Sequence, residues 1–111
     1  MSKCEPITLY NSILLNISQC KCCERIGLFY NNILVGFELS DFLAFCRGVE
    51  RLDFERHAVP FPNGAFYVIL DTCNEDIKFC FDKSQFFQLN LALGEAQLMI
   101  EVHQSLSSDR S

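Results

Sequence analysis

The hydrophobic positions of this chain alternate in two segments and recur with helical spacing in two others. In residues 25–37, apolar side chains occupy every second position on both sides of Asn31-Asn32. Such alternation is typical of strands, and asparagine tolerates the positive φ that a two-residue hairpin turn requires. We therefore predict a hairpin with Gly27 opposite Gly36, and we expect a packed helix to cover these two glycines. The predicted apolar face consists of Ile26, Leu28, Tyr30, Ile33, Val35 and Phe37.

A second hairpin is predicted between residues 66 and 81, with Asn74-Glu75 as its turn. This register places Asp71 opposite Lys78, and a cross-strand ion pair of this kind supports it. The predicted inward face consists of Val68, Leu70, Thr72, Ile77, Phe79 and Phe81.

Helical spacing appears after each hairpin. Apolar residues recur every three or four positions in residues 41–52, and Ser40 is a suitable N-cap for this first helix. A second helix is predicted to begin at Lys83 or Ser84 and to run to about residue 105. Asp82 and Gln85 have the spacing of a capping box at its start.

The last helix is apolar on two nearly opposite sides. One stripe consists of Phe86, Leu89, Leu93, Ala96, Ile100 and His103, and the other of Phe87, Leu91, Leu98 and Val102. One stripe can pack on the sheet, whereas the other needs cover from the first helix or from a second copy. We therefore expect a homodimer through the helix at 84–105.

These elements predict one domain over residues 1–111 with an α+β fold. It comprises a leading strand at 11–19, a first ββα unit at 25–52, a Pro-rich loop at 53–65, a second ββα unit at 66–105 and a polar tail at 106–111. The expected architecture is an antiparallel sheet of about five strands with two helices on one face. The two units share an aromatic–acid–spacer–serine pattern, which either duplication or the common chemistry of a strand-to-helix junction would explain.

Composition narrows the classes of function. The net charge is −5 and only nine residues are Lys or Arg, scattered along the chain, so we expect no nucleic-acid surface. The N-terminus lacks a signal peptide and no apolar run approaches the roughly 20 residues that span a bilayer. We therefore expect a cytoplasmic protein without membrane contact, whose seven cysteines are reduced thiols or metal ligands.

Three cysteines lie within the four residues 20–23, and they permit three interpretations. Cys20 and Cys23 have the spacing of a zinc knuckle, although Glu24 stands where a glycine commonly follows. Zinc is thus the one cofactor suggested, and further ligands would have to come from Cys4, Cys73, Cys80, His57 or His103. A redox dithiol is the second interpretation, but the segment after Cys23 resembles a strand rather than an activating helix. In the third, the cysteines are apolar core residues, as we expect for Cys46 and Cys80.

The sequence contains no phosphate-binding loop, nucleophile elbow or H-E-x-x-H motif, so we assign no catalytic residues. The leading interpretation is a non-enzymatic interaction or accessory protein that self-associates. The alternative is a metal-binding or thiol-redox protein that uses Cys20 and Cys23. A small ligand in the gap around Gly27 and Gly36 is a third option.

The run from Gln19 to Ile33 carries a C-x-x-C, an Ile-Gly-Leu strand and an Asn turn, and it leads to the Asp41-Phe42 helix start. In these features the chain resembles a small family of uncharacterised bacterial proteins with an N-terminal C-x-x-C motif. The resemblance covers most of residues 19–105. It implies a compact bacterial cytoplasmic domain and no particular activity.

Overall fold

The computed structural model describes residues 5–108, and the first half of this range is an antiparallel meander of four strands. They are β1 (Pro6–Asn11), β2 (Leu15–Cys20), β3 (Ile26–Tyr30) and β4 (Ile33–Phe37), in the spatial order β1-β2-β3-β4. β1 lies in a segment for which we expected no strand, and β2 replaces the leading strand predicted at 11–19. Proline is tolerated at the first position of a strand, so Pro6 excludes an early helix without excluding β1.

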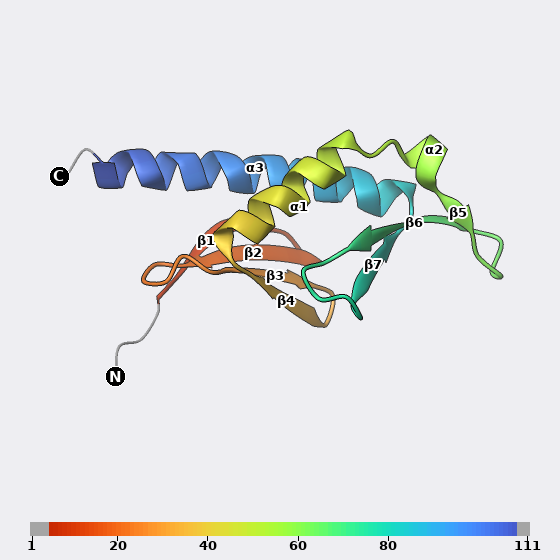
Figure 1. The fold of residues 1–111 in the computed structure, drawn as a ribbon, viewed down its shortest axis with the longest axis horizontal. Helices are drawn as coiled ribbons and strands as arrows, with labels where there is room; N and C mark the ends of the chain where they lie inside the picture. Colours follow the sequence, from red (N-terminus) through yellow and green to blue (C-terminus); the bar gives the residue numbers. More distant parts are fainter. Residues whose placement is uncertain (1–4, 109–111) are drawn as a thin grey trace.

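The second half combines three helices with a smaller sheet. It contains α1 (Leu39–Arg51), α2 (Phe54–His57), β5 (Val59–Pro60), β6 (Phe66–Asp71), β7 (Lys78–Phe81) and α3 (Lys83–Ser108). The small sheet has the order β5-β6-β7, so the strands form two sheets rather than one sheet of about five. α3 runs along the long axis of the molecule with α1 beside it, and both lie over the four-stranded sheet (Figure 1).

The pairing within both predicted hairpins is confirmed. Tyr30 pairs with Ile33 and Gly27 with Gly36, while Asn31 has the positive φ of 59° that the turn requires. In the second hairpin Asp71 pairs with Lys78, whose Nζ lies 2.6 Å from the Asp71 carboxylate.

The turn of the second hairpin is longer than predicted, because β6 ends at Asp71 and β7 begins only at Lys78. Within this turn the Thr72 hydroxyl donates to Ile77 O at 2.7 Å and lies 2.9 Å from Asn74 O. The Asn74 amide N–H donates back to the same hydroxyl at 3.1 Å. These local side-chain bonds compete with the regular strand ladder, which therefore stops early.

Helix boundaries differ from the predictions at three places. α1 begins at Leu39 with Glu38 as an N-cap that makes no side-chain cap bond, so Ser40 is not the cap. The expected loop at 53–65 contains α2 and β5, and Asp53 caps α2 by accepting from Glu55 N at 3.1 Å. α3 continues to Ser108, beyond the predicted end, so only residues 109–111 of the expected polar tail lie outside the described range.

The capping box at the start of α3 is confirmed. Asp82 N donates to Gln85 Oε1 at 2.9 Å, and Gln85 N donates to Asp82 Oδ1 at 2.8 Å. This reciprocal pair satisfies two backbone donors that a helix start otherwise leaves without partners.

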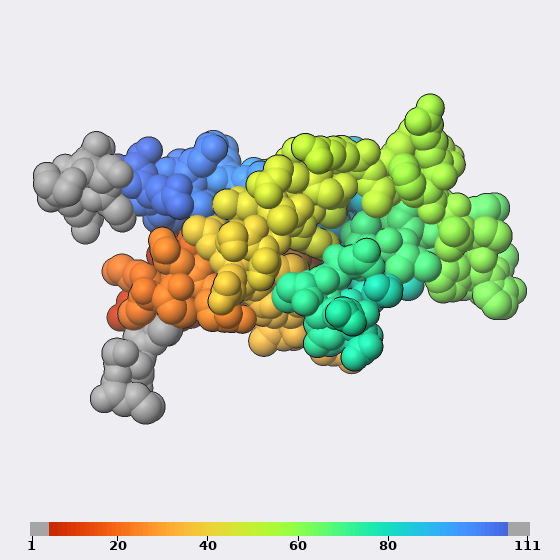
Figure 2. Space-filling view, in the orientation of Figure 1, coloured from red at the N-terminus to blue at the C-terminus, as the bar shows by residue number. Residues whose placement is uncertain are grey.

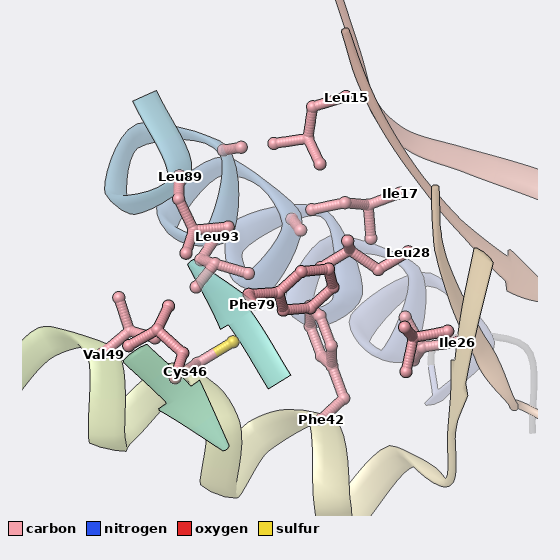
Figure 3. Packing of buried hydrophobic residues seen from close by; sticks show 14 of the residues in the cluster. Leu15, Ile17, Ile26, Leu28, Phe42, Cys46, Val49, Phe79, Leu89 and Leu93 are labelled. Atoms are coloured by element: carbon pink, nitrogen blue, oxygen red, sulfur yellow. The ribbon is translucent and has the colours of Figure 1, made fainter. Parts of the chain in front are cut away.

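One hydrophobic core joins the sheet to the two long helices. Inward side chains of β2 and β3 face α3 and α1, and Phe79 of β7 lies among them (Figure 3). The labelled members are Leu15, Ile17, Ile26, Leu28, Phe42, Cys46, Val49, Phe79, Leu89 and Leu93. The first stripe predicted on α3 is therefore the one that packs inward, and it ends at Ile100 and the half-buried His103.

Candidate functional site

The cysteine cluster lies in the turn that joins β2 to β3. Cys20 N donates to Arg25 O at 2.8 Å and Glu24 N donates to Cys20 O at 3.0 Å, which closes a tight loop of four residues. Inside it, the amide of Cys23 donates to the Sγ of Cys20 at 3.4 Å. The loop thus holds the two cysteines of the C-x-x-C close together. Cys20 is half-buried and Cys23 is exposed.

Glu24 gives the turn its shape and was missed as a structural residue by sequence reasoning. Its φ of 64° is left-handed, a conformation that glycine adopts readily and that costs other L-residues about 1–2 kcal/mol. The Gln19 side chain, only 7% exposed, donates through Nε2 to Glu24 O at 3.2 Å. Glu24 therefore takes the backbone conformation of the glycine whose absence weakened the knuckle interpretation.

Of the other residues proposed as ligands, Cys73, Cys80 and His57 lie elsewhere, whereas His103 lines a cavity together with Cys20. Cys73 follows β6 and its thiol donates to Gly36 O at 3.3 Å, while Cys80 is exposed on β7 rather than in the core as expected. His57 belongs to α2, at the other end of the molecule from the β2–β3 turn (Figure 1), and its Nδ1 lies 2.9 Å from Asp53 O. Cys4 lies outside the described residues. Within residues 5–108, no three His, Cys, Asp or Glu side chains are grouped to hold a metal ion.

The glycine pair is covered by a side chain and not by a helix. A Cβ on Gly36 would lie 3.3 Å from Nη2 of Arg25, and one on Gly27 would lie 3.5 Å from Leu34 Cδ1. The Arg25 guanidinium also lies 3.8 Å from the Glu38 carboxylate. The helices pack on the opposite face of β3 and β4, so the expectation of a helix over these glycines is wrong.

Three cavities lined by described residues offer room for small molecules, and one of them, of about 650 Å³, lies beside Gly36 and Cys73. A second, of about 410 Å³, lies between α1 and β6 and has mostly apolar walls, with Asp41, Asp71, Thr72 and Cys73 as its polar lining. A third, of about 790 Å³, separates the end of α3 from the start of β1 and is lined by His103, Glu5 and Cys20, among others. The buried Nε2 of His103 has no hydrogen-bond partner among the described residues. Sequence reasoning had placed His103 at the end of the inward stripe, but periodicity carries no information about its partners.

Burial alters the acidity of two groups. It raises the pKa of the Cys46 thiol to about 12, and the neighbouring Glu50 carboxylate acts in the same direction. Burial also raises the pKa of Tyr30, with a further contribution from Asp82. Cys46 is therefore a neutral, shielded thiol at physiological pH, which excludes it as a nucleophile.

The second apolar stripe of α3 lies at the surface. Its members are Phe87, Leu91, Leu98 and Val102, which are 64%, 54%, 58% and 40% exposed; we call them the outer stripe. α1 contacts α3 along a different side, where Gln97 Nε2 donates to Glu50 Oε1 at 3.1 Å. From the side shown in Figure 2, α1 covers the middle of α3 while the last turns of α3 stay at the surface. The first helix thus leaves the outer stripe uncovered.

Comparison of the chain with family models, curated proteins and solved structures gave no match. None of the helices in residues 5–108 is both long enough and apolar enough to cross a bilayer. The function therefore has to be inferred from the chemistry of the surfaces described above.

Proposed function

We propose that this protein is a non-enzymatic interaction or accessory protein that forms a homodimer through α3. The observation that carries the proposal is the outer stripe, four large apolar side chains that each expose about half of their surface. Contiguous apolar surface of this kind marks interaction sites on soluble proteins. The net charge of −5 supports a protein that does not bind nucleic acid, and its proposed location is the cytoplasm, without membrane contact.

The occupant inferred for this surface is a second copy, because the outer stripe is symmetric about its own middle. Phe87 and Val102 are equally distant from the bond between residues 94 and 95, and so are Leu91 and Leu98. A two-fold axis at that point, between antiparallel helices, would bring Leu91 of one copy onto Leu98 of the other. Residues seven positions apart drift by only about 20° around a helix, so the stripe remains on one side.

Gly94 occupies the middle of this arrangement. A Cβ added to it would meet nothing within 4 Å, so the position is open on the side where the second helix would cross. Glycine inside a helix costs about 1 kcal/mol relative to alanine, and close approach of two helices is a recurrent reason to retain it. The glycine therefore agrees with a crossing point at the centre of the outer stripe.

The expected affinity of the dimer is low. Burying a Leu, Val or Phe side chain completely contributes about 1.5–3 kcal/mol, so covering the exposed half of each contributes about 1 kcal/mol. The eight side chains of two outer stripes would then contribute about 8 kcal/mol, against about 4–15 kcal/mol for the lost freedom of association. The remainder is at best about 4 kcal/mol, which corresponds to a dissociation constant of about 1 mM. Glu95 and Glu101 flank the outer stripe on α3. The last turn of α3 carries no basic residue that could offset their charge. We therefore expect a weak dimer that salt strengthens by screening these carboxylates.

Light scattering over a range of protein concentrations up to about 1 mM tests the proposal. The wild-type chain should become dimeric as its concentration rises, and Leu98→Glu should stay monomeric because the interface would bury an unpaired charge. Leu34→Glu is the matched control: Leu34 is 68% exposed on β4, away from α3, and this variant should dimerise normally.

A charge-swap pair distinguishes the proposed geometry from other helix pairings. Leu91→Lys alone should weaken the dimer, and Leu91→Lys combined with Leu98→Glu should restore it, because the two new side chains face each other across the two-fold axis. In a parallel pairing each position faces itself and no rescue occurs. A strictly monomeric wild type, or a dimer that Leu34→Glu disrupts and Leu98→Glu does not, would refute the proposal.

A further inference from the structure

One side of α1 forms a wall of the cavity of about 410 Å³ between this helix and β6. The lining residues of α1 and its C-cap recur with helical spacing, and they are Asp41, Ala44, Phe45, Gly48, Val49 and Leu52. A Cβ added to Gly48 would meet nothing within 4 Å. Glycine weakens a helix interior relative to alanine, and no neighbour excludes a side chain here. The effect of Gly48 is therefore to leave the cavity open.

The opposite wall of this cavity is the free edge of a strand. β5 pairs with β6 only at the first two residues of β6, whereas β7 pairs with Val68 to Asp71. Residues from this second half of β6 line the cavity and none from β7 does, so the cavity lies along the edge of β6 that faces away from β7. Alternate residues of an antiparallel strand direct their backbone N–H and C=O groups to the same side. This edge therefore offers backbone hydrogen-bonding groups to a ligand.

The apolar part of the lining suits the body of a small molecule. The rings of Phe37 and Phe45 lie with their centroids 5.3 Å apart, and Val49 and Leu70 are buried beside them. The volume lies within the roughly 300–1,000 Å³ of small-molecule sites, which are mostly apolar with a few polar groups. An aromatic ring adds edge or offset contacts with the two phenylalanines.

The polar part of the lining selects the charge of the ligand. The described residues around the cavity include two carboxylates and no Lys or Arg. Asp71 is already paired with Lys78, whose Nζ lies 2.6 Å away, so Asp41 supplies the negative charge. An ammonium group carries three donors and no acceptor, and it forms charge-assisted hydrogen bonds to a carboxylate and further bonds to backbone carbonyls. The cavity is thus complementary to a cation on an apolar body.

We propose that the cavity between α1 and β6 binds a small primary amine with an apolar body. The body packs against Phe37 and Phe45 in the hollow at Gly48, and the ammonium group lies between Asp41 and the free edge of β6. This site shares no residue with the outer stripe on α3, so it is independent of the dimer.

Titration of the full-length chain with three matched compounds, followed by protein-observed NMR, tests the site. The compounds are phenylbutylamine, phenylbutanol and phenylbutanoate, which share one body and differ in the charge of the terminal group. The amine should bind about tenfold more tightly than the alcohol, the contribution of one hydrogen bond to a charged group, and the carboxylate should bind more weakly than either. The amide resonances that shift should belong to α1 and β6.

Two glycine variants test the position of the apolar body. Gly48→Leu fills the hollow and should weaken binding of the amine at least about tenfold, because the side chain occupies the space of the ligand. Gly94→Leu is the matched control: Gly94 is also a helical glycine whose added Cβ meets nothing within 4 Å, but it does not line the cavity. This variant should bind the amine as the wild type does. Far-UV circular dichroism establishes that each variant is folded.

Two acidic variants test the position of the ammonium group. Asp41→Asn should reduce the affinity for the amine to that for the alcohol, whereas Glu38→Gln, which removes an equal charge outside the cavity, should keep the preference. The proposal is overturned if the amine binds no more tightly than the alcohol, if Gly48→Leu binds the amine like the wild type, or if Glu38→Gln and Asp41→Asn have equal effects. Leu98→Glu should bind the amine normally, which separates this site from the dimer.

Discussion

Truncating one leucine on each side of α3 should give very different losses of stability. Leu93 is 1% exposed and lies in the core between the sheet and α1 (Figure 3), whereas Leu98 on the same helix is 58% exposed. Leu93→Ala removes buried methyl groups and leaves a cavity, which costs about 2–5 kcal/mol. Leu98→Ala loses only the covered part of its side chain, so within one chain its cost should stay below about 1 kcal/mol. Alanine also favours the helix at both positions.

The loss expected for Leu93→Ala is a large fraction of the roughly 5–15 kcal/mol that stabilises a domain. Urea denaturation followed by circular dichroism measures both variants, and an unchanged m-value indicates that the unfolding transition itself is unaltered. The measurement is made at a low and a high protein concentration. If α3 dimerises, the cost of Leu98→Ala should grow with concentration while that of Leu93→Ala stays the same.

Two results would refute the assignment of the two faces. One is a loss below about 1 kcal/mol for Leu93→Ala, which would mean that the inward stripe does not pack as described. The other is a loss for Leu98→Ala that equals that of Leu93→Ala at every concentration. In that case the outer stripe would be covered within a single chain.

Two further predictions concern the helix cap and the buried thiol. Gln85→Ala breaks one half of the Asp82–Gln85 capping box and should lower the free energy of unfolding by about 0.5–1.5 kcal/mol. Gln88→Ala is the control: Gln88 lies about one turn later on the exposed side of α3, and its substitution should change the free energy of unfolding by less than about 0.5 kcal/mol. Equal effects of the two substitutions in urea denaturation would contradict the cap. The folded pKa of Cys46 is raised from 9.0 to about 12, so its contribution to stability is complete below pH 9 and is lost as the pH rises toward 12. The wild type should therefore lose stability faster between about pH 9 and about pH 11 than Cys46→Ala does, by up to roughly 1 kcal/mol per pH unit, since Tyr30 titrates in both proteins. Equal slopes would show that Cys46 is not shielded.

The features that sequence predicts correctly are those decided by neighbouring residues. The register of β3 and β4 follows from Asn31-Asn32 and the alternation on both sides, and the capping box follows from Asp82 and Gln85 alone. The inward face of α3 follows from helical periodicity over about four turns, from Phe86 to Ile100. In each case the determining pattern lies within one continuous segment of the chain.

The features missed depend on contacts that periodicity does not encode. The β1–β2 turn contains Ile13 and Leu14, which are 100% and 47% exposed, so an apolar run concealed the break between two strands. Its bonds come from Ser12, whose amide donates to Leu15 O at 2.8 Å. The division into two sheets is likewise a tertiary property. Short apolar runs cannot indicate which strands will become neighbours.

The candidate sites show the same limit. The C-x-x-C spacing identifies Cys20 and Cys23, but sequence cannot reveal that Glu24 adopts a glycine-like φ or that the Cys23 amide points at sulfur. The absence of glycine after the motif counted against a knuckle, because glycine is the residue that adopts this conformation without strain. The turn has the conformation nonetheless, held by Gln19.

The two apolar sides of α3 illustrate how a structure converts an ambiguous pattern into a specific hypothesis. A helix that is apolar on opposite sides is either buried on both or covered by a partner on one. Sequence offered α1 and a second copy as covers for the outer stripe. α1 instead contacts α3 on the side of Gln97 and leaves the outer stripe exposed. The remaining candidate partner is a second copy of the chain, which the internal symmetry of the outer stripe fits.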